Sequence, residues 1–164
     1  MTRPVLPDLL APGLKLVFCG TAPSRASAKA SAYYARPGNR FWPALHSVGL
    51  TPRRFLPAEY PQLLALGIGL TDLAKHHSGN DDELPGDAFD VSALKEKLGR
   101  FAPAMVAFTS KNAAQAFFGR AVGYGLQEER LDATRFFVLT SPSGQAARFW
   151  DIECWRKLAG CMQA

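Results

Sequence analysis

The chain has 164 residues, of which 48% are apolar and 20% are charged, a composition typical of a folded protein of one domain's length. No apolar run approaches the ~18 residues of a membrane span, and two early prolines and an aspartate interrupt any signal-peptide pattern. We therefore expect a cytoplasmic protein with a single domain over residues 1–164. The net charge of +5 suits a polyanionic partner without identifying one.

Four short apolar runs predict buried strands, because each has the length of a strand and ends in Gly, Ser or Thr. They cover residues 14–20, 68–71, 104–110 and 136–140. Helical patterns alternate with them and cover residues 39–50, 61–66, 90–103, 111–121 and 146–163, with Phe149, Ile152 and Trp155 on one side of the last helix. This alternation predicts an α/β fold with a mostly parallel sheet covered on both faces.

Small and polar residues follow each predicted strand. These segments are residues 20–24, 71–72, 109–110 and 141–144. Because ligands of parallel sheets bind at the carboxyl ends of the strands, we expect the four segments to line one crevice. The first of them, GTAPS, carries no acid, base or strong nucleophile, so Asp72 is the acid of this crevice. Such a site suits a neutral ligand that is recognised by hydrogen bonds.

Several common site types find no support in the sequence. The patterns GxGxxG, GxxxxGK[ST] and GxSxG are absent, which leaves a Rossmann-type nucleotide-binding protein as a weak alternative. The three cysteines form no CxxC pair; they are Cys19, Cys154 and Cys161. The histidines lack metal-ligand spacing with the acids around them; they are His46, His76 and His77. We predict neither a metal nor a cofactor.

Aromatic residues alternate with Arg and Asn in SAYYARPGNRFW, residues 31–42. This pattern is typical of segments that stack on a nucleic-acid base and hold a phosphate, and Arg40 is a candidate for the phosphate contact. The alternative is that the aromatic side chains close the core over the edge of the sheet. We favour the core for Phe41 and Trp42, and a functional role for Tyr34.

These residues together resemble the uracil-DNA glycosylase superfamily, which has a four-stranded parallel sheet between helices, a three-layer α/β/α fold. VFCGTAPS resembles its first motif, and LTSPSGQAARFW resembles the second, the loop that enters the DNA minor groove. YYARPGNRFW resembles a segment of two branches, the mismatch-specific uracil/thymine and the hypoxanthine-DNA glycosylases. The resemblance implies hydrolysis of the N-glycosidic bond of a base flipped out of DNA, without metal or cofactor.

The resemblance also implies roles for individual residues. The base would contact the amides of Gly20, Thr21 and Ala22, the stacking ring of Tyr34, and Thr109, with Asn112 a weaker candidate. The DNA backbone would be gripped by Ser141, Pro142, Ser143 and Gly144, with Gln145 as the wedge that fills the vacated stack. Arg148 is a candidate for a phosphate contact or, equally well, a solvated helix residue.

The first motif departs from that of the mismatch-specific enzymes, which carry an Asn that positions the attacking water where this chain has Ala22. A methyl group can neither position nor polarise water, so this role must lie elsewhere. Two candidates are Asp72 and Asn39, the latter matching an Asn that looks catalytic in the hypoxanthine-DNA branch. Each has a plain alternative: Asp72 could cap a helix that begins in LTDLAK, and Asn39 could cap the helix at Phe41.

We expect a monomeric, monofunctional DNA glycosylase of base excision repair, with uracil as the first candidate base. Hypoxanthine or xanthine is the alternative, because Ala22 and YYARPGN both favour that branch. A different class also stays open: a catalytically inactive domain that binds damaged DNA and lost its chemistry with Ala22.

Overall fold

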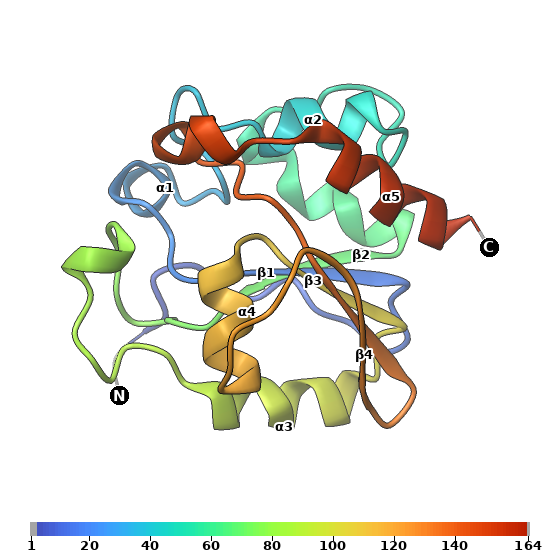
Figure 1. Ribbon diagram of the computed structural model, residues 1–164. Coiled ribbons are helices and arrows are strands. Elements are labelled where there is room, and N and C mark those ends of the chain that lie inside the picture. Colours follow the sequence, from blue (N-terminus) through green and yellow to red (C-terminus); the bar gives the residue numbers. More distant parts are fainter. Residues whose placement is uncertain (1–2, 164) are drawn as a thin grey trace.

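The computed structural model describes residues 3–163 and centres on one mixed sheet (Figure 1). The strands are β1 (Leu16–Gly20), β2 (Ile68–Asp72), β3 (Met105–Phe108), β4 (Gly125–Leu131) and β5 (Thr134–Val138). They lie in the order β2-β1-β3-β5-β4. The pairs β1–β2, β1–β3 and β3–β5 are parallel, and β4 runs antiparallel to β5. The four predicted strands are therefore confirmed as the parallel part of the sheet.

Helices connect the strands. The α-helices are α1 (Arg25–Ala30), α2 (Phe41–Ser47), α3 (Val91–Phe101), α4 (Lys111–Phe118) and α5 (Ile152–Met162). The 3-10 helices are η1 (Pro57–Leu66), η2 (Asp81–Glu83) and η3 (Gly144–Phe149), so the helix predicted at 61–66 is the second half of η1. Asp90 caps α3 by accepting a hydrogen bond from Ala93 N, and Ser110 caps α4. Across residues 3–163, no helix combines the length and apolar character needed to cross a membrane.

The sheet lies between two layers of helices, with α2 and α5 on one face and α3 and α4 on the other (Figure 1). Successive residues of β1 serve opposite faces, because side chains alternate along a strand. Phe18 packs against Phe41 and Trp155, with ring centroids 5.0 and 5.9 Å apart, whereas Val17 belongs to the core under α3 with Leu94. The predicted three-layer α/β/α fold is confirmed.

The predicted number of strands, four, is wrong, because β4 adds a fifth at the edge of the sheet. Its residues alternate between partly exposed and exposed positions, and Leu126 is 45% exposed. The sequence GLQEERL therefore lacks the continuous apolar run of a buried strand. A tight turn at Asp132, whose φ is +54°, folds β4 onto β5.

The helix predicted over 146–163 is divided in two. The 3-10 helix η3 ends at Phe149, and α5 begins after Asp151, whose carboxylate accepts a hydrogen bond of 3.0 Å from Glu153 N. Phe149 is 60% exposed, whereas Trp155 is buried against the sheet. The expected common face of Phe149 and Trp155 is therefore wrong, because the cap at Asp151 reorients the chain between them.

Candidate active site

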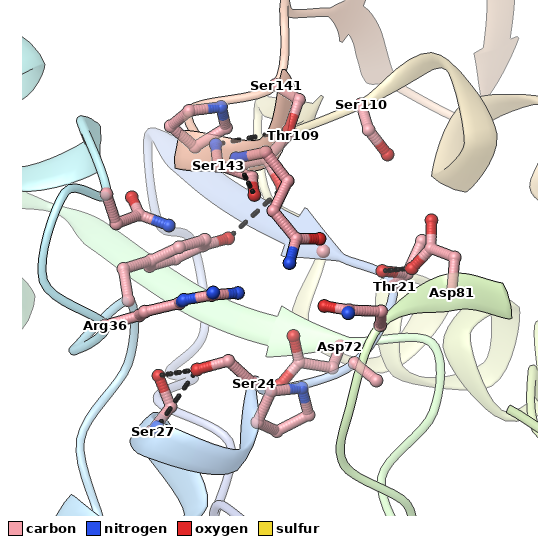
Figure 2. A pocket seen from close by; sticks show the side chains of 18 of the residues that line it. Thr21, Ser24, Ser27, Arg36, Asp72, Asp81, Thr109, Ser110, Ser141 and Ser143 are labelled. Atoms are coloured by element: carbon pink, nitrogen blue, oxygen red, sulfur yellow. Dashed lines mark hydrogen bonds between the residues drawn. The ribbon is translucent and has the colours of Figure 1, made fainter. Parts of the chain in front are cut away.

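A cavity of about 450 Å³ opens at the carboxyl ends of the parallel strands. Its lining includes residues from all four segments that follow the predicted strands, so the prediction that they share one crevice is confirmed. The residues that line it include Gly20, Asp72, Thr109 and Ser141. Figure 2 shows the side chains of Asp72, Thr109 and Ser141 around the opening. The volume is of the size that small-molecule sites in proteins have.

The floor of this cavity consists of Gly20, Tyr34, Asp72 and Thr109. A Cβ atom on Gly20 would lie 3.1 Å from Asp72 Oδ1 and 3.3 Å from both Thr109 Oγ1 and Tyr34 Oη. Three polar groups therefore converge on one backbone position, and only glycine leaves them room. This is the physical reason why β1 ends in glycine here.

Asp72 is the last residue of β2 and is 5% exposed. No helix follows it, so the interpretation as a helix cap is wrong: Leu73 N and Ala74 N instead donate to the carbonyls of Gly20 and Thr21 (2.9 and 2.7 Å). Among the described residues, Asp72 Oδ2 has no hydrogen-bond partner. Burial raises the pKa of Asp72 to about 6, although Lys75 acts to lower it. Oδ2 is itself buried, so Oδ1, the oxygen nearest to Gly20, is the atom that Asp72 presents toward the cavity.

Lys75 does not fully neutralise Asp72, because its ammonium group serves a second carboxylate. Its Nζ lies 3.7 Å from Asp72 Oδ2 but 2.8 Å from Asp8 Oδ1. Asp8 also pairs with Lys97, at 2.6 Å. Burial acts to raise the pKa of Asp8, but these two lysines hold it below its usual value. Asp8, in the N-terminal segment, therefore competes with Asp72 for the positive charge of Lys75 and Lys97.

Tyr34 is held in a fixed orientation. Its ring stacks on Phe41, with centroids 3.8 Å apart and planes at 14°, and its hydroxyl lies 3.3 Å from Thr109 Oγ1. Burial and the neighbouring Asp72 raise the pKa of Tyr34 well above its usual range, so the phenol stays neutral. Phe41 and Trp42 are buried in the core, as predicted.

Asn39 lines the same cavity. Its Oδ1 accepts a hydrogen bond of 2.9 Å from Phe41 N at the start of α2. The predicted capping contact is therefore present. It orients the amide and leaves the Nδ2 donor as a group that Asn39 can offer to a ligand.

The loop after β5 forms the upper wall of the cavity, with Ser141, Pro142, Ser143 and Gln145 among its lining residues. Arg40 N donates to Pro142 O (2.8 Å), and a Cβ on Gly144 would lie 3.5 Å from Gly38 O. The loop that follows Tyr34 and the loop that follows β5 therefore pack against one another. Gly144 contributes to this packing and not to the lining.

The sequence matches the model of the family described as the Uracil DNA glycosylase superfamily over residues 7–159. The chain belongs to the uracil DNA glycosylase superfamily. The fold agrees: a solution structure of a Methanosarcina acetivorans protein, provisionally named a uracil DNA glycosylase, is similar with a TM-score of 0.65 and 22% identity. The match covers 99% of this chain and 98% of that one. Membership in this superfamily supports a DNA N-glycosylase function, with DNA as the partner.

Some residues to which the resemblance gave a role lie away from the cavity of this superfamily member. Asn112 is exposed and does not line it; its Nδ2 donates to Asp81 Oδ2 at 2.7 Å. Arg148 is exposed, with its guanidinium 5.2 Å from the Phe149 ring. Arg40 lies over the Trp150 ring at 5.7 Å, outside the lining. None of these three side chains lines the cavity.

The structure also brings to the cavity Arg36, from the segment of alternating aromatic and polar residues, and the acidic turn, residues 79–83, of which residues 79–82 line it. Figure 2 shows Arg36 and Asp81 on opposite sides of the opening. Asp81 in this turn accepts a hydrogen bond of 2.6 Å from Thr21 Oγ1. The sequence indicates a polar loop there, but its contact with the first motif spans 60 positions and has no local pattern. Among the described residues, no three His, Cys, Asp or Glu side chains gather as metal ligands do.

Proposed function

We propose that this protein is a monofunctional DNA glycosylase of base excision repair that removes uracil from DNA and leaves an abasic site. The observation that supports this most is the floor of the cavity, where Asp72, Thr109 and Tyr34 surround Gly20. A flipped base needs a stacking ring, hydrogen-bonding groups at its edge and backbone that it can approach closely. The floor offers all of these within one cavity. We propose that the chain acts in the cytoplasm, as a monomer and as one domain.

The base would lie on the Tyr34 ring, whose opposite face is covered by Phe41. The amides of Thr21 and Ala22 would donate to a base carbonyl, and Thr109 would contact the base edge. Because Phe41 and Thr109 already fix Tyr34, little side-chain freedom is lost when a base binds. A preorganised floor of this kind favours flipping, which otherwise opposes binding by a few kcal/mol.

Bond cleavage places positive charge on the sugar and negative charge on the departing base. The buried carboxylate of Asp72, which Lys75 neutralises only in part, would stabilise the sugar cation electrostatically, an effect that is large in a site shielded from water. Asn39 would donate through Nδ2 to the incoming water or to the sugar. We propose these two residues as catalytic groups, Asp72 for the sugar cation and Asn39 as a hydrogen-bond donor.

The loop over residues 141–145 would hold the DNA backbone, and Gln145 would enter the space that the base vacates. Arg40 and Arg148 lie near this loop and would contact phosphates, consistent with the net charge of +5. Gln145 can form hydrogen bonds with the opposite base but stacks poorly, so we expect weak discrimination between opposite bases.

A second candidate substrate is hypoxanthine or xanthine, which Ala22 and the segment YYARPGN favour. An inactive domain that binds damaged DNA is the alternative from a different class, and Ala22 is the observation behind it. The presence of Tyr34, Asn39, Asp72 and the Pro-Ser-Gly loop in one crevice speaks for activity, since a decayed site would lose several of them.

The test is to incubate the protein with labelled single-stranded and duplex oligonucleotides that contain uracil, thymine, hypoxanthine or xanthine, and then to cleave abasic sites with alkali. We expect strand cleavage at uracil, and slower single-turnover excision by Asn39→Ala and Asp72→Ala. Cleavage at hypoxanthine or xanthine alone would assign the purine specificity. DNA binding without cleavage on any substrate would support the inactive domain, and full activity of both variants would refute their catalytic roles.

A further inference from the structure

The first motif provides no side chain at position 22 that could bind the attacking water, because the methyl group of Ala22 cannot form hydrogen bonds. A hydrolytic glycosylase needs an acceptor that orients the attacking water and takes up its proton. Asn39 is a neutral amide, which can hydrogen-bond to water but cannot take up its proton. Asp72 lies in the floor, beside Gly20, where the base would bind. If the protein hydrolyses the glycosidic bond as proposed above, another residue must hold the attacking water.

The acidic turn, residues 79–83, is attached to the first motif on both sides of Ala22. Before Ala22, Thr21 Oγ1 donates to Asp81 Oδ1 at 2.6 Å. After it, Pro23 O accepts a hydrogen bond of 2.9 Å from Gly79 N. A turn that is distant in sequence is therefore fixed beside Ala22 by hydrogen bonds to the residues before and after it.

The Asp81 carboxylate has a defined orientation. Its Oδ1 accepts from Thr21 and its Oδ2 accepts from Asn112 Nδ2 at 2.7 Å. A carboxylate oxygen can accept more than one hydrogen bond, so each retains a lone pair for water. Asp81 lines the cavity, and Figure 2 shows it next to Thr21 at the side of the opening. Asn112 thus serves the site through Asp81 and not through the base edge.

We propose that Asp81 is a catalytic residue that holds the attacking water in place of the side chain missing at position 22. As the bond from C1′ to the base nitrogen breaks, its electron pair leaves with the base. The water oxygen bonds to C1′, and the water proton passes to the Asp81 carboxylate and then to solvent. The base anion takes up one proton from solvent, so that one water is consumed and no other reactant is needed.

The test compares Asp81→Asn with Asp87→Asn, which removes the same charge from an exposed position of the same loop that does not line the cavity. With a base that the wild type removes, single-turnover excision by Asp81→Asn should fall by about 100-fold or more, whereas Asp87→Asn should match the wild type. Binding to a duplex with an abasic site should be retained, because loss of an acid near DNA removes repulsion.

A second variant separates catalysis from a structural role of Asp81 in holding Thr21 and Asn112. Ala22→Asn added to Asp81→Asn restores a polar side chain at the proposed water site, and we expect it to recover about tenfold or more of the lost rate. Thermal unfolding of each variant is measured alongside.

Full activity of Asp81→Asn would overturn the inference while leaving the proposed function intact. A loss of rate accompanied by equal losses of binding and stability, without rescue by Ala22→Asn, would also overturn it and assign Asp81 a structural role. Absence of excision by the wild type on every base tested would overturn the proposed function and this inference together.

Discussion

Two of the acidic residues that line the cavity lie in contrasting surroundings, Asp72 in the floor and Asp81 in the acidic turn. Asp72 is 5% exposed, lies at the end of a central strand and keeps an unpaired oxygen. Asp81 is exposed, lies in a short 3-10 helix and has a partner for each carboxylate oxygen. Burial makes the first carboxylate a strong electrostatic group whose charge depends on pH. The carboxylate of Asp81 is oriented by Thr21 and Asn112 and is accessible to water, which suits it to the proposed role of holding the attacking water.

The largest effect should come from adding a methyl group to Gly20 in the floor of the cavity. Gly20→Ala places a methyl group 3.1 Å from Asp72 Oδ1, tighter than ordinary contacts, so the converging side chains must move apart. We expect excision to fall by about 100-fold or more and stability to fall by about 1–3 kcal/mol. Single-turnover kinetics and urea unfolding measure both. Gly123→Ala, where the added methyl meets no atom within 4 Å, is the matched control; similar losses in both variants would contradict the convergence argument.

Next in size is the pH dependence of excision. Because the pKa of Asp72 is raised to about 6, mainly by burial, its stabilising negative charge is lost as the pH falls below that value. The single-turnover rate should drop by about tenfold per pH unit there, and Asp72→Asn should be slow and lack this limb. Tyr34 and Cys19 do not titrate in this range, because burial raises the pKa of both. If the excision rate of Asp72→Asn fell at low pH as that of the wild type does, the fall would be due to another titrating group.

The same carboxyl should reduce the stability of the fold at neutral pH. The pKa of Asp72 rises from 3.8 to about 6 on folding, so the unfolded chain releases its proton first as the pH increases. The free energy of unfolding therefore declines between these two values and stays reduced above them. Asp72→Asn should be more stable than the wild type above pH 6 by on the order of 1–3 kcal/mol, and should lose this advantage near pH 4.

Urea unfolding at the two pH values measures that difference, and Lys75 keeps Asp8 as a partner at 2.8 Å in the variant. An advantage of Asp72→Asn that is the same at both pH values would show that lost packing or hydrogen bonding, and not ionisation, sets the stability of the floor.

The smallest effect should come from removing the exposed ion pair between Arg25 and Glu83, which links α1 to the acidic turn. Arg25 pairs with Glu83 at 2.5 Å, but the arginine side chain is 73% exposed. Exposed ion pairs contribute about 0–1 kcal/mol, so Arg25→Gln should change the free energy of unfolding by less than that, with a smaller change in high salt. Excision should stay close to wild type, since Thr21, Pro23 and Asn112 still hold the turn. A large loss of activity would mean that the turn depends on this pair.

The sequence by itself determined the parallel core, because buried strands of an α/β fold are continuous apolar runs that end in small residues. LVFCG ends in Gly20, MVAF is followed by Thr109 and Ser110, and both runs are fully buried in the sheet. The crevice followed from the same pattern, since parallel strands present their carboxyl ends at one edge. Phe41 and Trp42 were also predicted as core residues, as aromatic side chains that close the core over the edge of the sheet.

Only the tertiary structure decided the features that depend on distant contacts. GLQEERL becomes β4 because β5 offers a free edge, and its own pattern is too polar to indicate a buried strand. The chain after Asp72 turns instead of forming a helix because Ala74 N donates a hydrogen bond to the carbonyl of Thr21. Asp81 reaches the first motif through Thr21, 60 positions away. Local periodicity reflects which residues are buried, whereas hydrogen bonds between loops depend on where the packed sheet brings them together.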